Sequence, residues 1–171
     1  FQTGVTEQYV DKFYQDVQTY AKDADTRLNS GSWSSIMDES AASARSSTLE
    51  DLNSRARKIK IWANVNRANY GDEWYNNLTG YLDNFAQSQK GIETDLKSAR
   101  DYYSQWGSEK EYTDYVNSDE YAWQTKYQGK NYSDIQKELR NLGPGAEKEW
   151  VTNYAESIKT REDWSKELSR S

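Results

Sequence analysis

Residues 75–106 read YNNLTGYLDNFAQSQKGIETDLKSARDYYSQW, and the spacing of their apolar positions decides the fold. Side chains suited to a buried seam recur at alternating intervals of four and three residues over more than four heptads, which is typical of one face of a long helix. This heptad seam comprises Leu78, Leu82, Phe85, Gln89, Ile92, Leu96, Ala99, Tyr103 and Trp106. Its one polar amide, Gln89, is placed where a buried amide can fix the register of paired helices. The stretch therefore predicts a helix over about 72–106 that pairs with another helix.

Two earlier stretches carry the same three-four spacing. A helix is predicted over about 6–28, with the stripe Val10, Phe13, Val17, Tyr20 and Ala24. Another is predicted over about 49–70, with the stripe Leu49, Leu52, Ala56, Ile59, Ala63, Asn66 and Tyr70. Thr48 and Asp51 resemble a capping box in front of this second helix.

Two places leave the helix boundaries open. Residues 33–47 are rich in Ser and Ala and weakly patterned, so they form either a helix in close contact with a neighbour or a loose connector. Gly80 and Gly91 each cost a helix about 1 kcal/mol relative to Ala, so the third segment is either one kinked helix or two helices.

After Gly107 the pattern changes to short units. Ser108 with Glu111 and Ser133 with Gln136 indicate helix starts, and weaker starts are indicated at Ser118 and Thr160. These short helices carry an aromatic set made of Tyr112, Tyr115, Tyr121, Trp123, Tyr127 and Tyr132. No run of β-branched residues alternates with polar ones, so strands are not expected.

The fold class that follows is all-α, with elongated coiled-coil or bundle segments over 1–106 and short aromatic-rich helices over 107–171. Leu, Ile, Val and Phe together number 24 of 171 residues, below the roughly one fifth that usually accompanies a packed globular core. Against disorder stand 7 Trp and 14 Tyr, which bury large areas. We expect thin, aromatic-rich seams.

The chain contains neither cysteine nor histidine. Disulfides, thiolate metal sites and a cysteine nucleophile are thereby excluded, and the most frequent general base and transition-metal ligand is missing. There is no glycine-rich phosphate loop, and Asp-rich stretches lack the pattern of a calcium loop. We expect a protein that is not an enzyme and that uses no cofactor or metal.

Net charge argues against two classes of partner. At −6, with a pI near 4.8, the chain is not suited to nonspecific binding of nucleic acid or an anionic membrane. No window approaches the roughly 18 apolar residues of a membrane span. The net charge is −4 for residues 1–40, +4 for residues 41–70 and −6 for residues 71–171. Basic residues are concentrated at Arg55, Arg57, Lys58, Lys60 and Arg67, with Trp62 among them. We interpret this concentration as a solvated face or a match to an acidic neighbour; single-stranded nucleic acid, bound through charge and stacking, is the less favoured alternative.

Abundant Trp and Tyr beside carboxylates also suit a glycan-binding groove. Carboxylates near aromatics are Asp72, Glu73, Glu111, Asp114, Asp119 and Glu120. Nothing in their spacing brings two of them face to face for cleavage of a glycosidic bond.

Residues 102–142, YYSQWGSEKEYTDYVNSDEYAWQTKYQGKNYSDIQKELRNL, and residues 147–164, EKEWVTNYAESIKTREDW, resemble segments of tail-associated structural proteins of phages, in particular the helical tape-measure proteins. The resemblance implies a helical polypeptide that oligomerises in or at the tip of a phage tail. It implies a place in the virion.

Our leading hypothesis is a structural or assembly protein that acts through helix pairing with copies of itself or with other helical proteins. On this hypothesis Leu82→Asp or Leu96→Asp separates the oligomer or melts the helix. The alternative is a monomeric helical module whose aromatic set holds a glycan or peptide, although rings at helical spacing more often fill gaps between helices.

Overall fold

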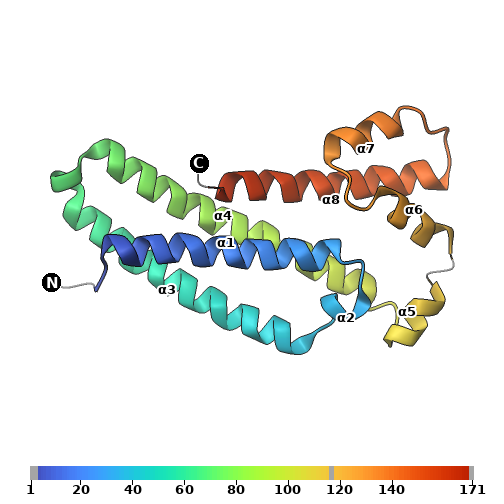
Figure 1. Ribbon diagram of the computed structural model, residues 1–171, viewed down its shortest axis with the longest axis horizontal. Helices are drawn as coiled ribbons and strands as arrows, with labels where there is room; N and C mark the ends of the chain where they lie inside the picture. The colour runs from blue at the N-terminus through green and yellow to red at the C-terminus, as the bar shows by residue number, and fades with distance from the viewer. Residues whose placement is uncertain (1–3, 116–117, 170–171) are drawn as a thin grey trace. The chain divides into compact units, whose positions relative to one another are not determined.

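The structure, a computed structural model, describes residues 4–115 and 118–169 and is built from helices (Figure 1). Eight helices and no strand occur in the described residues, which confirms the all-α prediction. They are α1 (Glu7–Asn29), α2 (Trp33–Ile36), α3 (Glu39–Tyr70), α4 (Asp72–Tyr103), α5 (Glu109–Tyr115), α6 (Asp119–Tyr127), α7 (Tyr132–Leu139) and α8 (Ala146–Leu168). The expected coiled-coil elongation stays a prediction.

The chain divides into two compact units. The first unit takes Phe1–Asp23, Asp38–Lys90 and Glu167–Ser171, and the second takes Ala24–Met37 and Gly91–Lys166. This spatial grouping differs from a division of the sequence at residue 106, because α1, α4 and α8 each contribute residues to both units.

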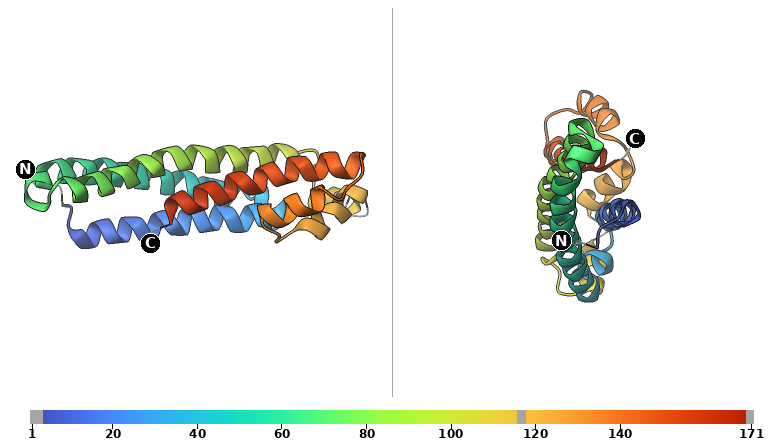
Figure 2. Two further views of the ribbon diagram at one scale, coloured as in Figure 1. Left: turned by 90° about the horizontal axis from the view of Figure 1, so that it is seen from above. Right: turned by 90° about the vertical axis from the view of Figure 1, so that its left-hand side faces the viewer.

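In the first unit, α3 and α4 run antiparallel on either side of Gly71, as the views in Figures 1 and 2 agree. Gly71 has φ +94°, which L side chains rarely adopt, and its N–H donates to Arg67 O at 2.8 Å. The glycine thus ends α3 and lets α4 begin one residue later.

Helix α1 packs its predicted stripe into this unit. Val10, Phe13, Val17 and Tyr20 are all buried. The Phe13 ring meets Phe85 of α4 edge-on, with centroids 5.6 Å apart, and Tyr14 meets Tyr81 in the same way at 4.5 Å. Such edge-to-face pairs add to the burial of apolar area, which contributes roughly 25 cal/mol per Å².

The start predicted for α3 near Thr48 is wrong. The helix begins ten residues earlier, at Glu39, because the carboxylate of Asp38 accepts a hydrogen bond from Ala41 N at 3.0 Å and caps the first turn. Asp51 is not a capping residue, since its carboxylate accepts from Arg55 one turn later at 3.2 Å. The Ser- and Ala-rich residues 33–47 therefore contribute short α2 and the first turns of α3.

Helix α4 is continuous. It runs through both Gly80 and Gly91 without interruption, so it is not two helices. It ends at Tyr103, three residues before the predicted end, and Trp106 lies in the turn that follows.

The second unit contains two apolar clusters. One joins α6, α7 and α8 and consists of Tyr127, Ile135, Leu139, Val151, Ala155 and Ile158. The other is centred on Ile36, Tyr103 and Tyr112. At this second cluster the indole N–H of Trp33 points between two carbonyls, Tyr103 O and Trp106 O, each at 3.1 Å. Trp33 thereby fastens α2 to the end of α4.

The helix starts predicted for the C-terminal part are partly confirmed. Ser108 Oγ accepts from Glu111 N at 3.2 Å, and Ser118 Oγ accepts from Tyr121 N at 3.4 Å. The start at Ser133 is wrong, because Asn131 Oδ1 caps α7 instead. The start at Thr160 is also wrong, because Thr160 lies inside α8 and its hydroxyl donates to Glu156 O. The residues on both sides of Thr160 therefore belong to one helix, α8.

Candidate functional site

The heptad seam is covered by helices of the same chain. In the first unit Leu78, Leu82 and Phe85 are buried, and in the second unit Ile92, Leu96 and Tyr103 are buried. The remaining seam residues are half-buried: Gln89, Ala99 and Trp106. The apolar area of the seam is therefore removed from water within one chain, and its burial requires no second copy.

Gln89 fixes the register of α4 against α3. Its amide Nε2 donates to Asn53 Oδ1 at 2.8 Å, and Asn53 Nδ2 donates back to Gln89 Oε1 at 3.1 Å. Both side chains are half-buried. A reciprocal amide pair of this kind satisfies all four polar atoms only when the two helices are in this one register.

Asn53→Ala is expected to destabilise the chain by about 1–2 kcal/mol, because it leaves the half-buried Gln89 amide without its partner. The double variant Asn53→Leu with Gln89→Leu is expected to recover most of that loss, since two apolar groups replace two amides. Urea unfolding of the single and double variants measures both effects. A double variant less stable than Asn53→Ala would show that the pair stabilises the fold by more than supplying each amide with a hydrogen-bond partner.

The predicted basic concentration on α3 separates into paired and unpaired members. Arg55 Nη1 donates to Asp16 of α1 at 2.7 Å as well as to Asp51. Burial raises the pKa of Asp16, but hydrogen bonds from Lys12 and Arg55 outweigh it, so this pKa lies below its usual value. Arg67 pairs with Asp72 at 2.8 Å. The attraction predicted between this basic segment and acidic α1 is thus present at Arg55.

Arg57, Lys58 and Lys60 are exposed and make no ion pair with any residue in the described ranges. Ile61 and Val65 lie among them, and their side chains are 45% and 64% exposed. We call these five residues the outward face of α3.

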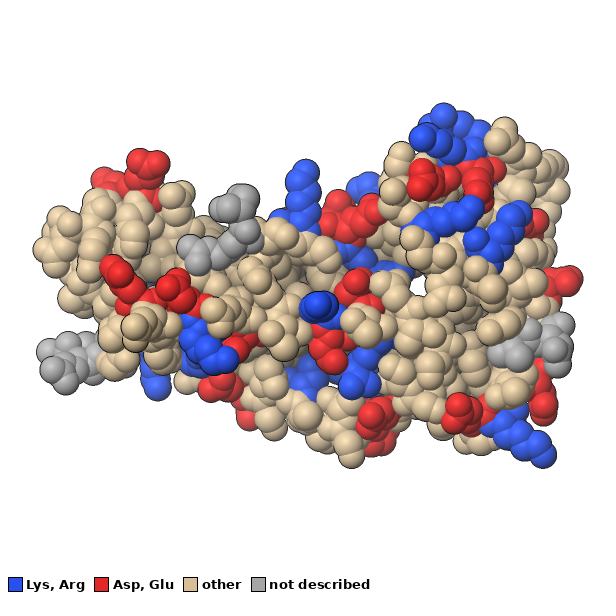
Figure 3. Space-filling view, in the orientation of Figure 1, with Lys and Arg blue, Asp and Glu red and all other residues tan. Residues whose placement is uncertain are grey.

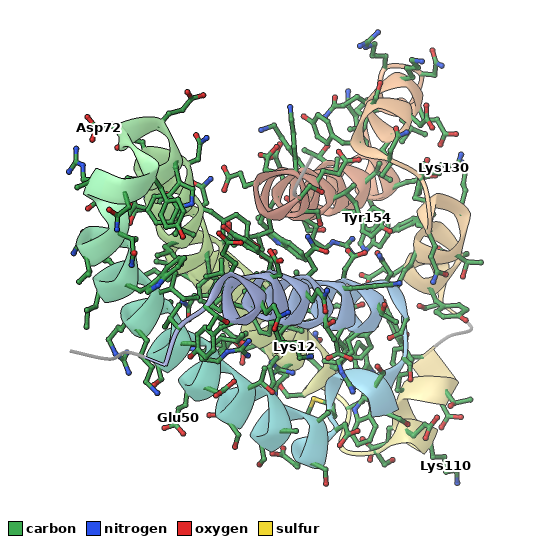
Figure 4. The ribbon with its side chains drawn as sticks, turned by 60° about the vertical axis from the view of Figure 1, so that its left-hand side comes forward. Lys12, Glu50, Asp72, Lys110, Lys130 and Tyr154 are labelled. Carbon is green, nitrogen blue, oxygen red and sulfur yellow. The ribbon has the colours of Figure 1, made fainter. Side chains whose placement is uncertain are left out.

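The geometry of the helix explains this exposure. Ile61 follows the buried Ile59 by two residues, which is about 200° around the helix, so the two side chains point in opposite directions. Glu50 lies about three helical turns before Ile61 on the same side, and Figure 4 shows it projecting away from the neighbouring helices. The sequence stripe through Ile59 and Ala63 identified the core side of α3, and the apolar pair on the other side was missed.

Tyr70 departs from its predicted place in the buried stripe. It is 48% exposed, and its ring lies beside that of Trp74, with centroids 4.8 Å apart. Trp62 completes this aromatic group at 5.5 Å from Trp74. Tyr70 is the last residue of α3, and its exposure shows that the buried stripe ends before it.

The aromatic set proposed to face a ligand is mostly used for packing. Tyr112 and Tyr127 are buried, and their hydroxyls donate to Gly31 O at 2.9 Å and Glu147 Oε1 at 3.2 Å. The remaining members are half-buried: Tyr115, Tyr121, Trp123 and Tyr132. Trp123 and Tyr132 pack against the cluster around Tyr127. None of the six residues is fully exposed.

Three of the candidate carboxylates hold structural hydrogen bonds. Asp72 accepts from Arg67, and Glu111 accepts from Gly107 N at 2.6 Å. Glu120 accepts from the Tyr115 hydroxyl, whose pKa is raised by burial and by this carboxylate. Within residues 4–115 and 118–169 no three acidic side chains gather closely enough to hold a metal ion.

The exposed charges are mixed in sign. Figure 3 shows Lys and Arg interspersed with Asp and Glu on the face it presents. None of the helices in the described part of the chain combines the length and apolar character needed to cross a bilayer.

In comparisons with known proteins, no protein-family model, no curated protein and no solved structure matched the chain.

Proposed function

We propose that the chain is a non-enzymatic helical assembly protein that associates with other copies of itself through the outward face of α3. The observation that carries this proposal is the exposure of Ile61 and Val65, whereas the apolar stripes of α1 and α4 are buried or half-buried. The setting implied by the resemblance of residues 102–142, a phage tail, belongs to the same proposal.

Charge complementarity supports a second copy as the partner. The net charge of residues 41–70 is +4, whereas that of residues 1–40 is −4 and that of residues 71–171 is −6. The three unpaired cations of the outward face therefore attract the acidic helices of another copy, while Ile61 and Val65 supply the apolar contact. A contact between two different surfaces is heterologous, so it builds rings or filaments rather than closed pairs.

The size of the face sets the strength of the contact. Two exposed aliphatic side chains with three cations form a small patch, well below the area of stable protein–protein interfaces. We therefore expect weak association of each pair of copies, strengthened by repetition along the assembly. Its cationic part makes the association sensitive to salt.

Val65→Asp is expected to weaken self-association and so to lower the average molar mass measured in solution. The carboxylate places a charge in the apolar centre of the contact and cancels part of its positive field, while the folded chain tolerates it because the position is exposed. Light scattering over a range of protein concentrations at low and physiological salt measures the effect.

The matched control is Asn84→Asp, an exposed change of equal charge on α4, outside the outward face. The proposal requires that the average molar mass rise with protein concentration for the original chain and for Asn84→Asp. For Val65→Asp the rise must be smaller. A monomer at every concentration and salt would reject assembly through this face.

A further inference from the structure

A cavity of about 520 Å³ lies within the second unit, between α4, α6 and α8. This volume falls within the range of small-ligand pockets, roughly 300–1,000 Å³. None of the rings of the aromatic set over 112–132 lines it. The cavity is therefore separate from the groove that the sequence suggested.

Aromatic and amide side chains share the walls. Tyr102 and Tyr103 come from the last turn of α4, and Trp150 and Tyr154 come from α8, on which Figure 4 labels Tyr154. The rings of Trp150 and Tyr154 stack 5.0 Å apart at 13°. Tyr102, Trp150 and Tyr154 are only half-buried, so aromatic surface remains open to an occupant.

The cavity also holds polar groups that the fold does not use. The side chains of Gln124, Asn153 and Ser98 line it and make no hydrogen bond with any residue that the structure describes. Each amide both donates and accepts, and so does a hydroxyl. A ligand rich in hydroxyl groups matches this mixture better than one that only donates or only accepts.

The two charged groups at the cavity offset each other. Arg161 is 7% exposed and donates to Asn29 Oδ1, and Asp95 accepts from Trp164 Nε1 at 3.1 Å. Burial raises the pKa of Asp95, while the Trp164 hydrogen bond and the positive charge of Arg161 lower it in part. With one charge of each sign, the cavity favours neither a cation nor an anion.

We propose that this cavity is a binding site for a neutral saccharide of one or two rings. The apolar C–H face of a pyranose would lie on the exposed aromatic surface of Trp150 or Tyr154. Its hydroxyls would exchange hydrogen bonds with Asn153, Gln124 and the oxygen atoms of Asp95. This site goes beyond assembly through α3 and lies in the other unit.

The test follows the indole N–H of Trp150 by NMR in the ¹⁵N-labelled full chain, with its signal identified by its loss in Trp150→Phe. Cellobiose and N,N′-diacetylchitobiose are titrated to about 10 mM, which fills a site whose Kd is about 1 mM. Glycerol is the control for a small polyol. Free tyrosine is the control for an aromatic zwitterion as the occupant of the cavity.

A saturable shift of the Trp150 signal with either disaccharide is expected, and none with glycerol. Asn153→Ala is expected to weaken binding about fivefold to tenfold, the loss of roughly one hydrogen bond. The matched variant Asn84→Ala, an exposed helical asparagine outside the cavity, should bind as the original chain does.

Three results would overturn the proposal: no saturable shift with the disaccharides, equal binding by Asn153→Ala and Asn84→Ala, or a shift with tyrosine alone. Val65→Asp separates the two proposals, because it lowers assembly without touching the cavity. If no self-association is observed but the disaccharides still shift the Trp150 signal, the proposal of assembly is rejected and that of the saccharide site is kept.

Discussion

Leu82→Asp is expected to remove about 4 kcal/mol or more of folding free energy, a large part of the roughly 5–15 kcal/mol of a typical domain. Leu82 is 6% exposed in the first unit, where the Phe13–Phe85 and Tyr14–Tyr81 pairs join α1 to α4. The substitution removes apolar burial and places an unpaired carboxylate in the same site. Urea unfolding followed by circular dichroism measures the loss.

Val65→Asp is the matched control for this change, since it introduces the same carboxylate at a position that is 64% exposed. Its free energy of unfolding should stay within about 0.5 kcal/mol of that of the original chain, as for other surface substitutions. If Leu82→Asp instead kept full helicity and stability and only lowered the mass in solution, the seam would be an interface between copies. That result would contradict its coverage within one chain.

Tyr127→Ala is expected to cost about 3–5 kcal/mol, in the range of large aromatic truncations in cores. Tyr127 is 0% exposed and lies at the centre of the cluster that joins α6, α7 and α8. Removing the ring leaves a cavity that Ile135 and Val151 cannot fill without moving the helices that carry them. The loss should be visible as a lower urea midpoint and a weaker near-ultraviolet signal.

Tyr127→Phe keeps the ring and removes only the hydrogen bond to Glu147, so its expected cost is about 1 kcal/mol. The contrast between the two variants separates packing from the hydroxyl. A ligand-facing Tyr127 would give the opposite result, with near-original stability in both variants and weaker ligand binding in each.

The sequence predicted the long helices well because their apolar spacing is itself the physical cause of burial. Val10, Phe13 and Val17 repeat on one stripe, and all three are buried. The start of α3 could not be found in this way, since residues 39–48 contain no large apolar side chain before Leu49. That part of the helix depends on Asp38 as a cap and on the tolerance of Ala and Ser for helical geometry.

The sequence could not predict which helix covers each apolar stripe. Heptad spacing shows that Leu82 and Phe85 need a covering helix, but it does not say whether that helix belongs to the same chain or to another. Gln89 was identified as a register residue from its place in the seam. Its partner Asn53 carries no such mark, because it becomes relevant only when α3 and α4 are placed antiparallel.

The candidate sites were the hardest to predict, for a related reason. Tyr127 and Trp150 are both aromatic residues among polar ones, yet the first is enclosed by three helices and the second borders a cavity. Only the packing of α6 and α8 distinguishes them. The exposed pair Ile61 and Val65 did carry a signal in the sequence, since two aliphatic residues one turn apart fall outside the buried stripe of α3.

The hydroxyls of Tyr102 and Tyr115 lie 3.0 Å apart, and Tyr115 is also hydrogen-bonded to Glu120. Because a phenol has one proton and Tyr115 gives its own to the Glu120 carboxylate, the proton between the two rings must come from Tyr102. The three groups thus form a one-way donor chain from the end of α4 through α5 to α6. Replacement of Glu120 by glutamine would supply an amide that can also donate, so the two phenolic hydrogen bonds could then reverse; one exposed carboxylate thus sets the direction in which both hydroxyls point.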